Sequence, residues 1–274
     1  MAEPLGQSDV RRALAEDLAS GDITTRLLGA AATRAAALRF VAEAKFVVAG
    51  LPVVELTFRE LDPHAQLETH VADGSWAESG VTVATVRAQA RALLSGERVA
   101  LNFLQRLSGI ATLTRRVVDA VAGTGAQITH TRKTTPGLRA LEVYAVRMGG
   151  GVDNRASLAD AVLWKDNHWV LLEGTLTDAL KSAPPGVPVI VEVENDVQLA
   201  AALSAGVTHI LVDNQTPEKL AAWAQTAGPR VTIQASGGIT AETARAYAEA
   251  GANLIAIGAL THSAPAAAIR CELD

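Results

Sequence analysis

The chain has 274 residues, of which 49% are hydrophobic, so it can bury a sizeable core and is not a disordered protein. Its 24 basic and 29 acidic residues give a net charge of −5, which argues against a nucleic-acid partner. Residues 1–30 contain acids and polar breaks, and no apolar run reaches the length of a membrane span. The one cysteine, Cys271, fits a reducing compartment. These features predict a cytoplasmic protein without a membrane partner.

The first hundred residues carry the alternating pattern of half-exposed antiparallel strands, and two turn signals, Asp62-Pro63 and Asp73-Gly74, interrupt it. The expected strands cover residues 38–48, 66–71 and 81–87. We interpret residues 1–105 as an N-terminal α/β (α+β) sandwich domain, which the C-terminal tail of residues 265–274 is expected to join.

A long helical stretch over about residues 97–121 follows, with Gly109 as a candidate interruption. Beyond it, short apolar strands alternate with amphipathic helices, a pattern typical of parallel βα units buried on both faces. Four strand centres recur every 20 to 23 residues, at Ile190, Ile210, Ile233 and Ile255. With two further strands near Ile128 and Val162, and room for one more, residues 106–264 predict an incomplete parallel β/α barrel of six or seven strands.

The segment Thr131-Arg132-Lys133-Thr134-Thr135-Pro136-Gly137 lies at a predicted strand-to-helix junction. Two adjacent cations beside free backbone N–H groups favour anion binding, although a solvated basic turn is the alternative for this segment alone. Barrel active sites lie at the carboxyl ends of the strands, and phosphate sites lie at glycine-bearing turns after the last strands. The residues expected to meet there are Arg132-Lys133, Lys165-Asp166-Asn167-His168, Glu192, Glu194, Asp213-Asn214, Ser236-Gly237-Gly238 and Gly258-Ala259.

Carboxylates beside a phosphate site can hold Mg²⁺ that bridges phosphate oxygens, or accept hydrogen bonds from ribose hydroxyls. Glu192 is expected to be a structural acid that points the opposite way from Glu194. The chain shows no zinc-type His/Cys spacing, no P-loop and no GxGxxG motif, which argues against zinc, ATP and dinucleotides as ligands.

Further motifs extend from Glu16-Asp17 and Gly21-Asp22-Ile23-Thr24 to the C-terminus. They include Glu97-Arg98, Ser108-Gly109-Ile110-Ala111-Thr112, Gly149-Gly150-Gly151 and Gly258-Ala259-Leu260-Thr261-His262-Ser263. Together with the residues at the strand ends, they resemble the quinolinate phosphoribosyltransferase family, also known as nicotinate-nucleotide pyrophosphorylases (carboxylating). The resemblance implies a sandwich domain with an incomplete barrel. It also implies a homodimer, or a higher even-numbered assembly, whose active sites are shared between subunits.

The resemblance further implies a reaction of NAD biosynthesis: phosphoribosyl pyrophosphate (PRPP) and quinolinate give nicotinate mononucleotide, pyrophosphate and CO₂, with Mg²⁺. Arg98 would reach a substrate carboxylate from the partner subunit. Glu194 and Asp213 would serve the ribose and the Mg²⁺, and act in catalysis with Lys133 and Lys165. The remaining implied contacts are Thr131, Arg132, Lys133, Arg155 and Lys165 for the substrates, and Ser236, Gly237, Gly238, Ile257, Gly258 and Ala259 for the 5′-phosphate.

Three positions depart from the family's pattern: His130 stands where Asp is usual, Asp153-Asn154 replaces Asn-His, and Gln234 replaces an acid. Because Asn154 carries no charge, binding of a dicarboxylate would weaken unless His130 compensates as a cation. We therefore count His130 and Asn154 among the expected substrate-binding residues. Three alternatives stay open: quinolinate itself, a different pyridine or heteroaromatic carboxylate, and a phosphate-binding barrel without catalysis. A sugar-phosphate isomerase or aldolase would leave the arginines without a role.

Overall fold

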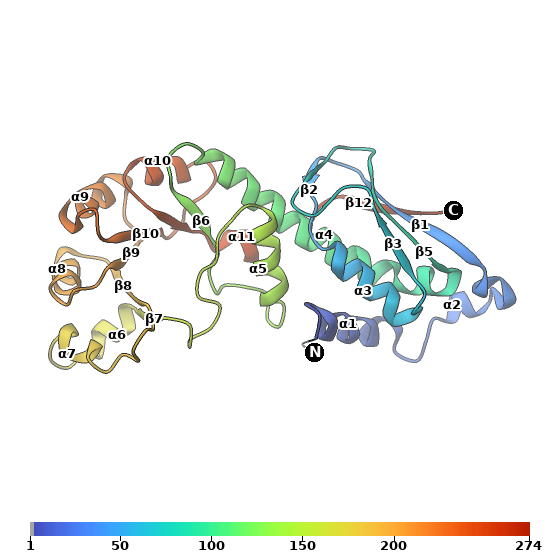
Figure 1. Ribbon diagram of the computed structural model, residues 1–274, viewed down its shortest axis with the longest axis horizontal. Coiled ribbons are helices and arrows are strands. Elements are labelled where there is room, and N and C mark those ends of the chain that lie inside the picture. Colours follow the sequence, from blue (N-terminus) through green and yellow to red (C-terminus); the bar gives the residue numbers. More distant parts are fainter. Residues whose placement is uncertain (1–2) are drawn as a thin grey trace. The chain divides into compact units, whose positions relative to one another are not determined.

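The computed structural model describes residues 3–274, which fall into two compact units (Figure 1). The first unit contains the segment that ends at Arg115, together with Thr134–Gly150 and Thr261–Asp274. The second contains Arg116–Lys133 and Gly151–Leu260. The predicted boundary lies between residues 105 and 106, and residues 134–150 group with the first unit rather than with the barrel.

The first unit is built on a four-stranded antiparallel sheet in the order β12-β1-β5-β3. In β1, side chains that alternate along the strand are buried, with Leu38 and Phe40 in the core beside Phe58. The C-terminal strand β12 pairs with β1, so the tail completes this sheet. The strands are β1 (Ala35–Ala42), β3 (Gln66–Thr69), β5 (Thr82–Gln89) and β12 (Ile269–Leu273), and a separate pair joins β2 (Phe46–Val47) to β4 (Trp76–Ala77).

Helices accompany this sheet, and the longest is α4 (Ala90–Ala120). It runs through Gly109 without a break, so the predicted interruption is wrong. A side chain at position 109 would collide with the carbonyl oxygen of Pro265, so a tertiary contact requires glycine there. The other helices of this unit are α1 (Gln7–Leu18), α2 (Ile23–Arg26), η1 (Gly29–Thr33), α3 (Leu51–Leu61), α5 (Arg139–Met148) and α11 (Ala259–His262), the last of which begins in the second unit.

The second unit holds a six-stranded parallel sheet in the order β6-β11-β10-β9-β8-β7, which confirms the incomplete parallel barrel. The described residues contain no pairing of β6 with β7, so the ring stays open. A single parallel bridge from Thr129 to Val152 lies at the free edge of β6. The strands are β6 (Gln127–Thr129), β7 (Val162–Trp164), β8 (Val189–Val193), β9 (His209–Asp213), β10 (Thr232–Ser236) and β11 (Leu254–Ala256).

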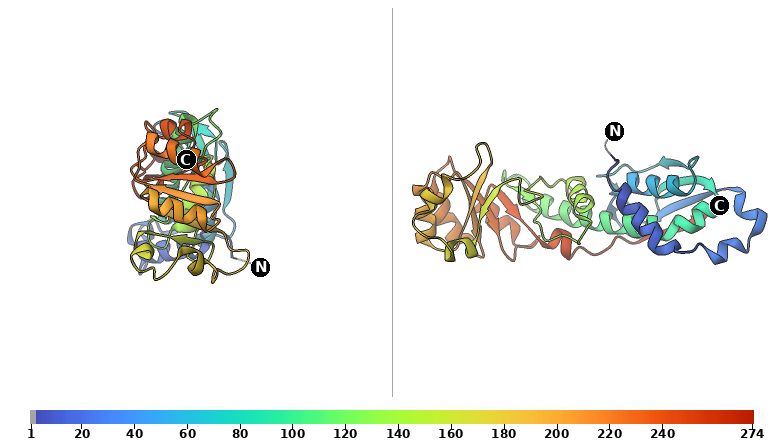
Figure 2. Two further views of the ribbon diagram at one scale, coloured as in Figure 1. Left: turned by 90° about the vertical axis from the view of Figure 1, so that its left-hand side faces the viewer. Right: turned by 90° about the horizontal axis from the view of Figure 1, so that it is seen from below.

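The helices between these strands lie together on one side of the sheet, as Figure 1 and the right-hand view of Figure 2 show. Asn195 and Thr216 cap two of them, because each side-chain oxygen accepts a hydrogen bond from a backbone N–H in the first turn. They are α6 (Asp166–Val170), α7 (Leu176–Leu180), α8 (Asp196–Ser204), α9 (Pro217–Ala227) and α10 (Ala244–Glu249). No helix within residues 3–274 has both the length and the apolar character needed to cross a membrane.

Candidate active site

A cavity of about 210 Å³ opens at the carboxyl ends of the strands of the second unit. Its base is largely apolar, because Leu163, Ile190, Leu211 and Ala256 line it from β7, β8, β9 and β11. Polar and charged side chains at or just beyond the strand ends surround this base. Among the predicted site residues, it brings together Thr131, Arg132, Lys133, Asn154, Arg155, Lys165, Asp213 and Ser236.

Two guanidinium groups give the cavity a cationic side. Burial lowers the pKa of Arg155, and the charge of Arg132 lowers it further, while Glu192 and Asp160 act in the opposite direction. Arg155 donates from Nη1 to the carbonyl oxygen of Ala161 at 3.2 Å. The buried Nε of Arg132 has no hydrogen-bond partner among the described residues. The positive charges of Arg132 and Arg155 repel each other, and both guanidinium groups have unused N–H donors. Both features favour binding of an anion, which would reduce the repulsion.

The cavity lining also contains an ion pair between a half-exposed lysine and a buried carboxylate. Lys165 Nζ lies 2.7 Å from Glu192 Oε2, and the Glu192 side chain is only 6% exposed. Trp169 Nε1 donates to the Glu192 carbonyl oxygen at 2.9 Å and fixes this strand end. Glu192 therefore holds the lysine ammonium at the cavity wall.

Glu192, which we expected to be a structural acid facing away from Glu194, lines the cavity instead. Glu194 is exposed, is not part of the lining, and its backbone N–H donates to Gln198 Oε1 at 2.7 Å. Residues two apart on a strand point to the same face, so the predicted opposite directions of Glu192 and Glu194 were wrong. Strand β8 ends at Val193, and Glu194 already belongs to the following turn.

Two family models match nearly the whole chain. The model described as "Quinolinate phosphoribosyl transferase, N-terminal domain" matches residues 22–108, and that of the C-terminal domain matches residues 110–272. The chain belongs to the quinolinate phosphoribosyltransferase family. This confirms the resemblance drawn from the sequence motifs.

Relatives of known identity agree with this assignment. The nicotinate-nucleotide pyrophosphorylase [carboxylating] of Mycobacterium leprae is 44% identical over 264 residues, which cover 93% of this chain and 92% of that protein. The probable enzyme of the same name from Bacillus subtilis is 40% identical over 253 residues, covering 90% and 86%. The crystal structure of nicotinate-nucleotide pyrophosphorylase from Ehrlichia chaffeensis matches at a TM-score of 0.92, with 34% identity and full coverage of both chains.

Several residues implied by the family resemblance lie outside the cavity lining: Arg98, His130, Glu194, Gly237, Gly238, Ile257, Gly258 and Ala259. The glycine turn after β10 nevertheless starts from Ser236, which does line the cavity. Gly237 and Gly238 have φ angles of 100° and 61°, in the left-handed region that favours glycine. A side chain at Gly237 would collide with Asn214, so the turn requires glycine for close packing. The phosphate-binding role of these turns stays a prediction.

Gln234, one of the three expected departures from the family's pattern, lies in the cavity lining, and its side-chain partner is His209. Their side chains meet at 2.8 Å, between His209 Nε2 and Gln234 Oε1. Gln234 also lines the cavity and is only 1% exposed. Burial lowers the pKa of His209, against a smaller opposing effect of the bond to Gln234. A neutral histidine–glutamine pair therefore contributes Gln234 to the cavity lining.

This buried histidine predicts a loss of stability in acid. Its pKa is lower in the folded chain than in the unfolded one, so the unfolded chain binds the extra proton first. The free energy of unfolding should fall by up to about 1.4 kcal/mol per pH unit from about pH 6.5 down to the folded pKa. His209→Gln keeps an amide donor toward Gln234 and should lack this component. Urea unfolding of both proteins from pH 8 to pH 5 measures the difference, and parallel curves would contradict the prediction.

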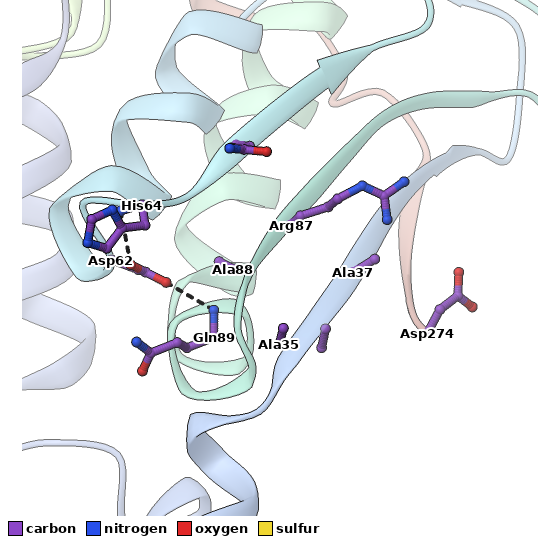
Figure 3. Close-up of a pocket in the computed structure, with 10 residues that line it drawn as sticks. Ala35, Ala37, Asp62, His64, Arg87, Ala88, Gln89 and Asp274 are labelled. Carbon is purple, nitrogen blue, oxygen red and sulfur yellow. Dashed lines mark hydrogen bonds between the residues drawn. The ribbon is translucent and has the colours of Figure 1, made fainter.

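A second, more open hollow lies in the first unit, at one end of the strands of the antiparallel sheet (Figure 3). Its carboxylate, Asp62, accepts backbone N–H bonds from His64 and Gln89 at 3.0 Å each. These bonds, the one from Gln89 first, lower the pKa of Asp62. Much of the remaining wall is alanine, and Arg87 lies apart from Asp62 in the view. Asp62 thus organises a turn, and no set of cations converges here as it does in the barrel.

Proposed function

We propose that this protein transfers the phosphoribosyl group of PRPP to quinolinate, with loss of CO₂, and releases nicotinate mononucleotide and pyrophosphate. The observation that carries the proposal is the barrel-mouth cavity of a chain of this family. Its lining brings Arg132 and Arg155 together with the Lys165–Glu192 ion pair. Such a cavity can bind an aromatic dicarboxylate and a phosphate ester side by side.

The arginine side suits the aromatic acid. A guanidinium group is always charged and presents its donors in a planar fork, so it can bind a carboxylate through two parallel bonds. Arg132 has a buried donor without a partner among the described residues, and a carboxylate would complete it. The apolar base formed by Leu163, Ile190 and Leu211 can accept the flat face of the pyridine ring.

The lysine side suits PRPP. The bond between ribose C1 and the pyrophosphate oxygen breaks while the ring nitrogen of the acid forms a bond to C1. Positive charge develops on the sugar and negative charge on the departing pyrophosphate. Lys133 and Lys165 can stabilise the negative charge of the pyrophosphate. Glu192 is a cavity carboxylate that can face the sugar, and it takes the place we assigned to Glu194 from the sequence. The reaction requires no side-chain nucleophile.

Mg²⁺ belongs to this proposal as a companion of PRPP. Within residues 3–274, no group of three or more His, Cys, Asp or Glu side chains could hold a metal alone. Mg²⁺ is commonly held by one or two carboxylates plus substrate phosphates and water, and Asp213 in the cavity fits that mode. When bound, it would neutralise charge on the pyrophosphate group. Glu194, the second predicted ligand, lies outside the lining, so Asp213 is the ligand we propose.

Purified protein with PRPP, Mg²⁺ and quinolinate is expected to release pyrophosphate and CO₂ in equal amounts. Nicotinate and other heteroaromatic acids form the comparison set, because Asn154 and Gln234 depart from the family's pattern. Faster pyrophosphate release with another acid, without CO₂, would identify a related enzyme of different specificity. No pyrophosphate with any acid, but tight PRPP binding in calorimetry, would instead indicate the phosphate-binding barrel. The cytoplasmic location also remains a proposal, and cell fractionation tests it.

A further inference from the structure

The side-chain amide of Asn154 is engaged by the protein's own backbone. Its Nδ2 donates to the carbonyl oxygen of His130 at 3.0 Å. Its Oδ1 accepts the backbone N–H of Arg155 at 2.8 Å. Although Asn154 reaches the cavity lining, its acceptor and a donor are already committed. The amide therefore holds the backbone around Arg155, and this uses its oxygen and one of its two N–H donors.

His130 completes this arrangement from the other side. Its ring is buried, with 1% of the residue exposed, and it does not line the cavity. The backbone N–H of Asn154 donates to His130 Nε2 at 3.2 Å. A backbone N–H can only donate, so Nε2 must carry a lone pair and no proton. Nδ1 then carries the proton and faces the Thr131 carbonyl oxygen at 3.3 Å. In this geometry His130 is an acceptor, not the compensating cation that the sequence suggested.

These contacts continue the edge of β6 along the segment that carries Arg155. Val152 N–H donates to the Ile128 carbonyl oxygen at 2.8 Å, and Thr129 Oγ1 donates to the Val152 carbonyl oxygen at 2.9 Å. The His130–Asn154 bonds are the last of the series, next to the cavity. Arg132 follows His130 by two residues, and Arg155 follows Asn154 directly.

We propose that His130 and Asn154 form a positioning pair that fixes Arg155 relative to Arg132 without either residue binding the substrate. Burial first, and then the charge of Arg132, lower the pKa of Arg155, so the two guanidinium groups repel each other. The hydrogen bonds between His130 and Asn154, and from the Arg155 backbone to Asn154, hold the segment against that repulsion. The pair thereby determines the spacing of the two carboxylate-binding groups and the selectivity for a dicarboxylate. This assignment of substrate rests on the proposed function.

Two variants of His130 provide a matched test. In His130→Gln the amide oxygen can reach the position of Nε2, whereas in His130→Asn the shorter amide cannot. His130→Asn should raise the KM for quinolinate about tenfold, the value of one lost hydrogen bond, with kcat and the KM for PRPP within about twofold of the unmodified protein. His130→Gln should stay within about threefold in every constant. Equal defects in the two variants, or a fall in kcat alone, would overturn the positioning pair.

A second measurement does not depend on turnover. In protein labelled with ¹⁵N-arginine, the Nε–H signal of Arg155 is assigned by its loss in Arg155→Ala. That signal should move in His130→Asn and in Asn154→Ala, and should return in His130→Gln. An unchanged signal in the first two variants would rule out the positioning role. If the unmodified protein turned over no quinolinate, the proposed function would fail, but this comparison would still decide whether the pair positions Arg155.

Discussion

Lys165→Ala is expected to lower kcat/KM by about a thousandfold, at the upper end of the range for loss of one group that stabilises transition-state charge. The variant removes the ammonium group that lies 2.7 Å from Glu192 at the cavity wall. In the proposed reaction the departing pyrophosphate would then lose a matching cation. Steady-state pyrophosphate release at saturating Mg²⁺ measures the loss. Lys181→Ala is the matched control, because Lys181 is 71% exposed and pairs only with the exposed Asp178 among the described residues.

The same substitution also leaves a buried carboxylate without its partner, and this second effect must be separated from the first. An unpaired buried charge is costly, so Lys165→Ala alone could act through a disturbed Glu192. In Lys165→Ala/Glu192→Gln the carboxylate charge is gone as well. We expect this double variant to be no more active than the single one, because the cation is still missing and the carboxylate proposed to face the sugar is gone as well. Glu192→Gln alone measures the second loss. Recovery of activity would show that Lys165 serves mainly to neutralise Glu192.

The strands of the barrel could be predicted because their burial leaves a local signature. The predicted strand centre Ile210 is the second residue of β9 (His209–Asp213), because helices cover one face of this strand and the barrel interior covers the other. The N-terminal strand was expected to be unbroken over residues 38–48, but it divides into β1 and β2 around Glu43 and Lys45. Alternation of polar and apolar residues continues through such a bend, so the pattern could not locate it.

Distant packing is what the sequence could not reveal. Gly109 looks like a helix breaker because glycine has low helix propensity, and nothing nearby indicates the Pro265 backbone that lies against it. Asn154 is similar. Its replacement of a histidine indicates a weaker cation set, but only the structure shows that its amide is bound to His130 and to the Arg155 backbone.

The candidate site could be predicted from one rule, that the active site of a β/α barrel lies at the carboxyl ends of its strands. That rule correctly brought the segment after β6 together with Lys165, Asp213 and Ser236, although these lie far apart in sequence. The direction of the Glu192 side chain was predicted wrongly, because two acids two residues apart were taken to diverge. The signal that would have found it is the strand periodicity itself: Ile190 and Glu192 must share a face, and Ile190 belongs to the interior.

Arg98 supports the last prediction, an active site shared between two subunits. It lies on α4 in the first unit, is exposed, and has no carboxylate within ion-pair distance among residues 3–274. All residues lining the barrel cavity belong to the second unit. We propose that the protein is a homodimer, or a higher even-numbered assembly, in which Arg98 of one subunit serves the cavity of its partner. Reciprocal contacts about a twofold axis would complete both sites at once.

Mixing two inactive variants tests this proposal. Arg98→Ala and Lys133→Ala are each expected to lower kcat/KM by about a hundredfold or more. In a mixed dimer one site would contain an intact Lys133 and the partner's intact arginine, while the other site would lack both. Random exchange of equal amounts makes half of the dimers mixed, so about a quarter of the unmodified activity should return.

The control is a mixture of Lys133→Ala with Lys165→Ala. Both lysines line the cavity of the same subunit, so every subunit in this mixture lacks one of them. No dimer then contains an intact site, and activity should stay low. Mass spectrometry of the mixed assembly establishes that exchange has occurred. With exchange established, no recovery in the Arg98 mixture would show that Arg98 does not act across the subunit interface.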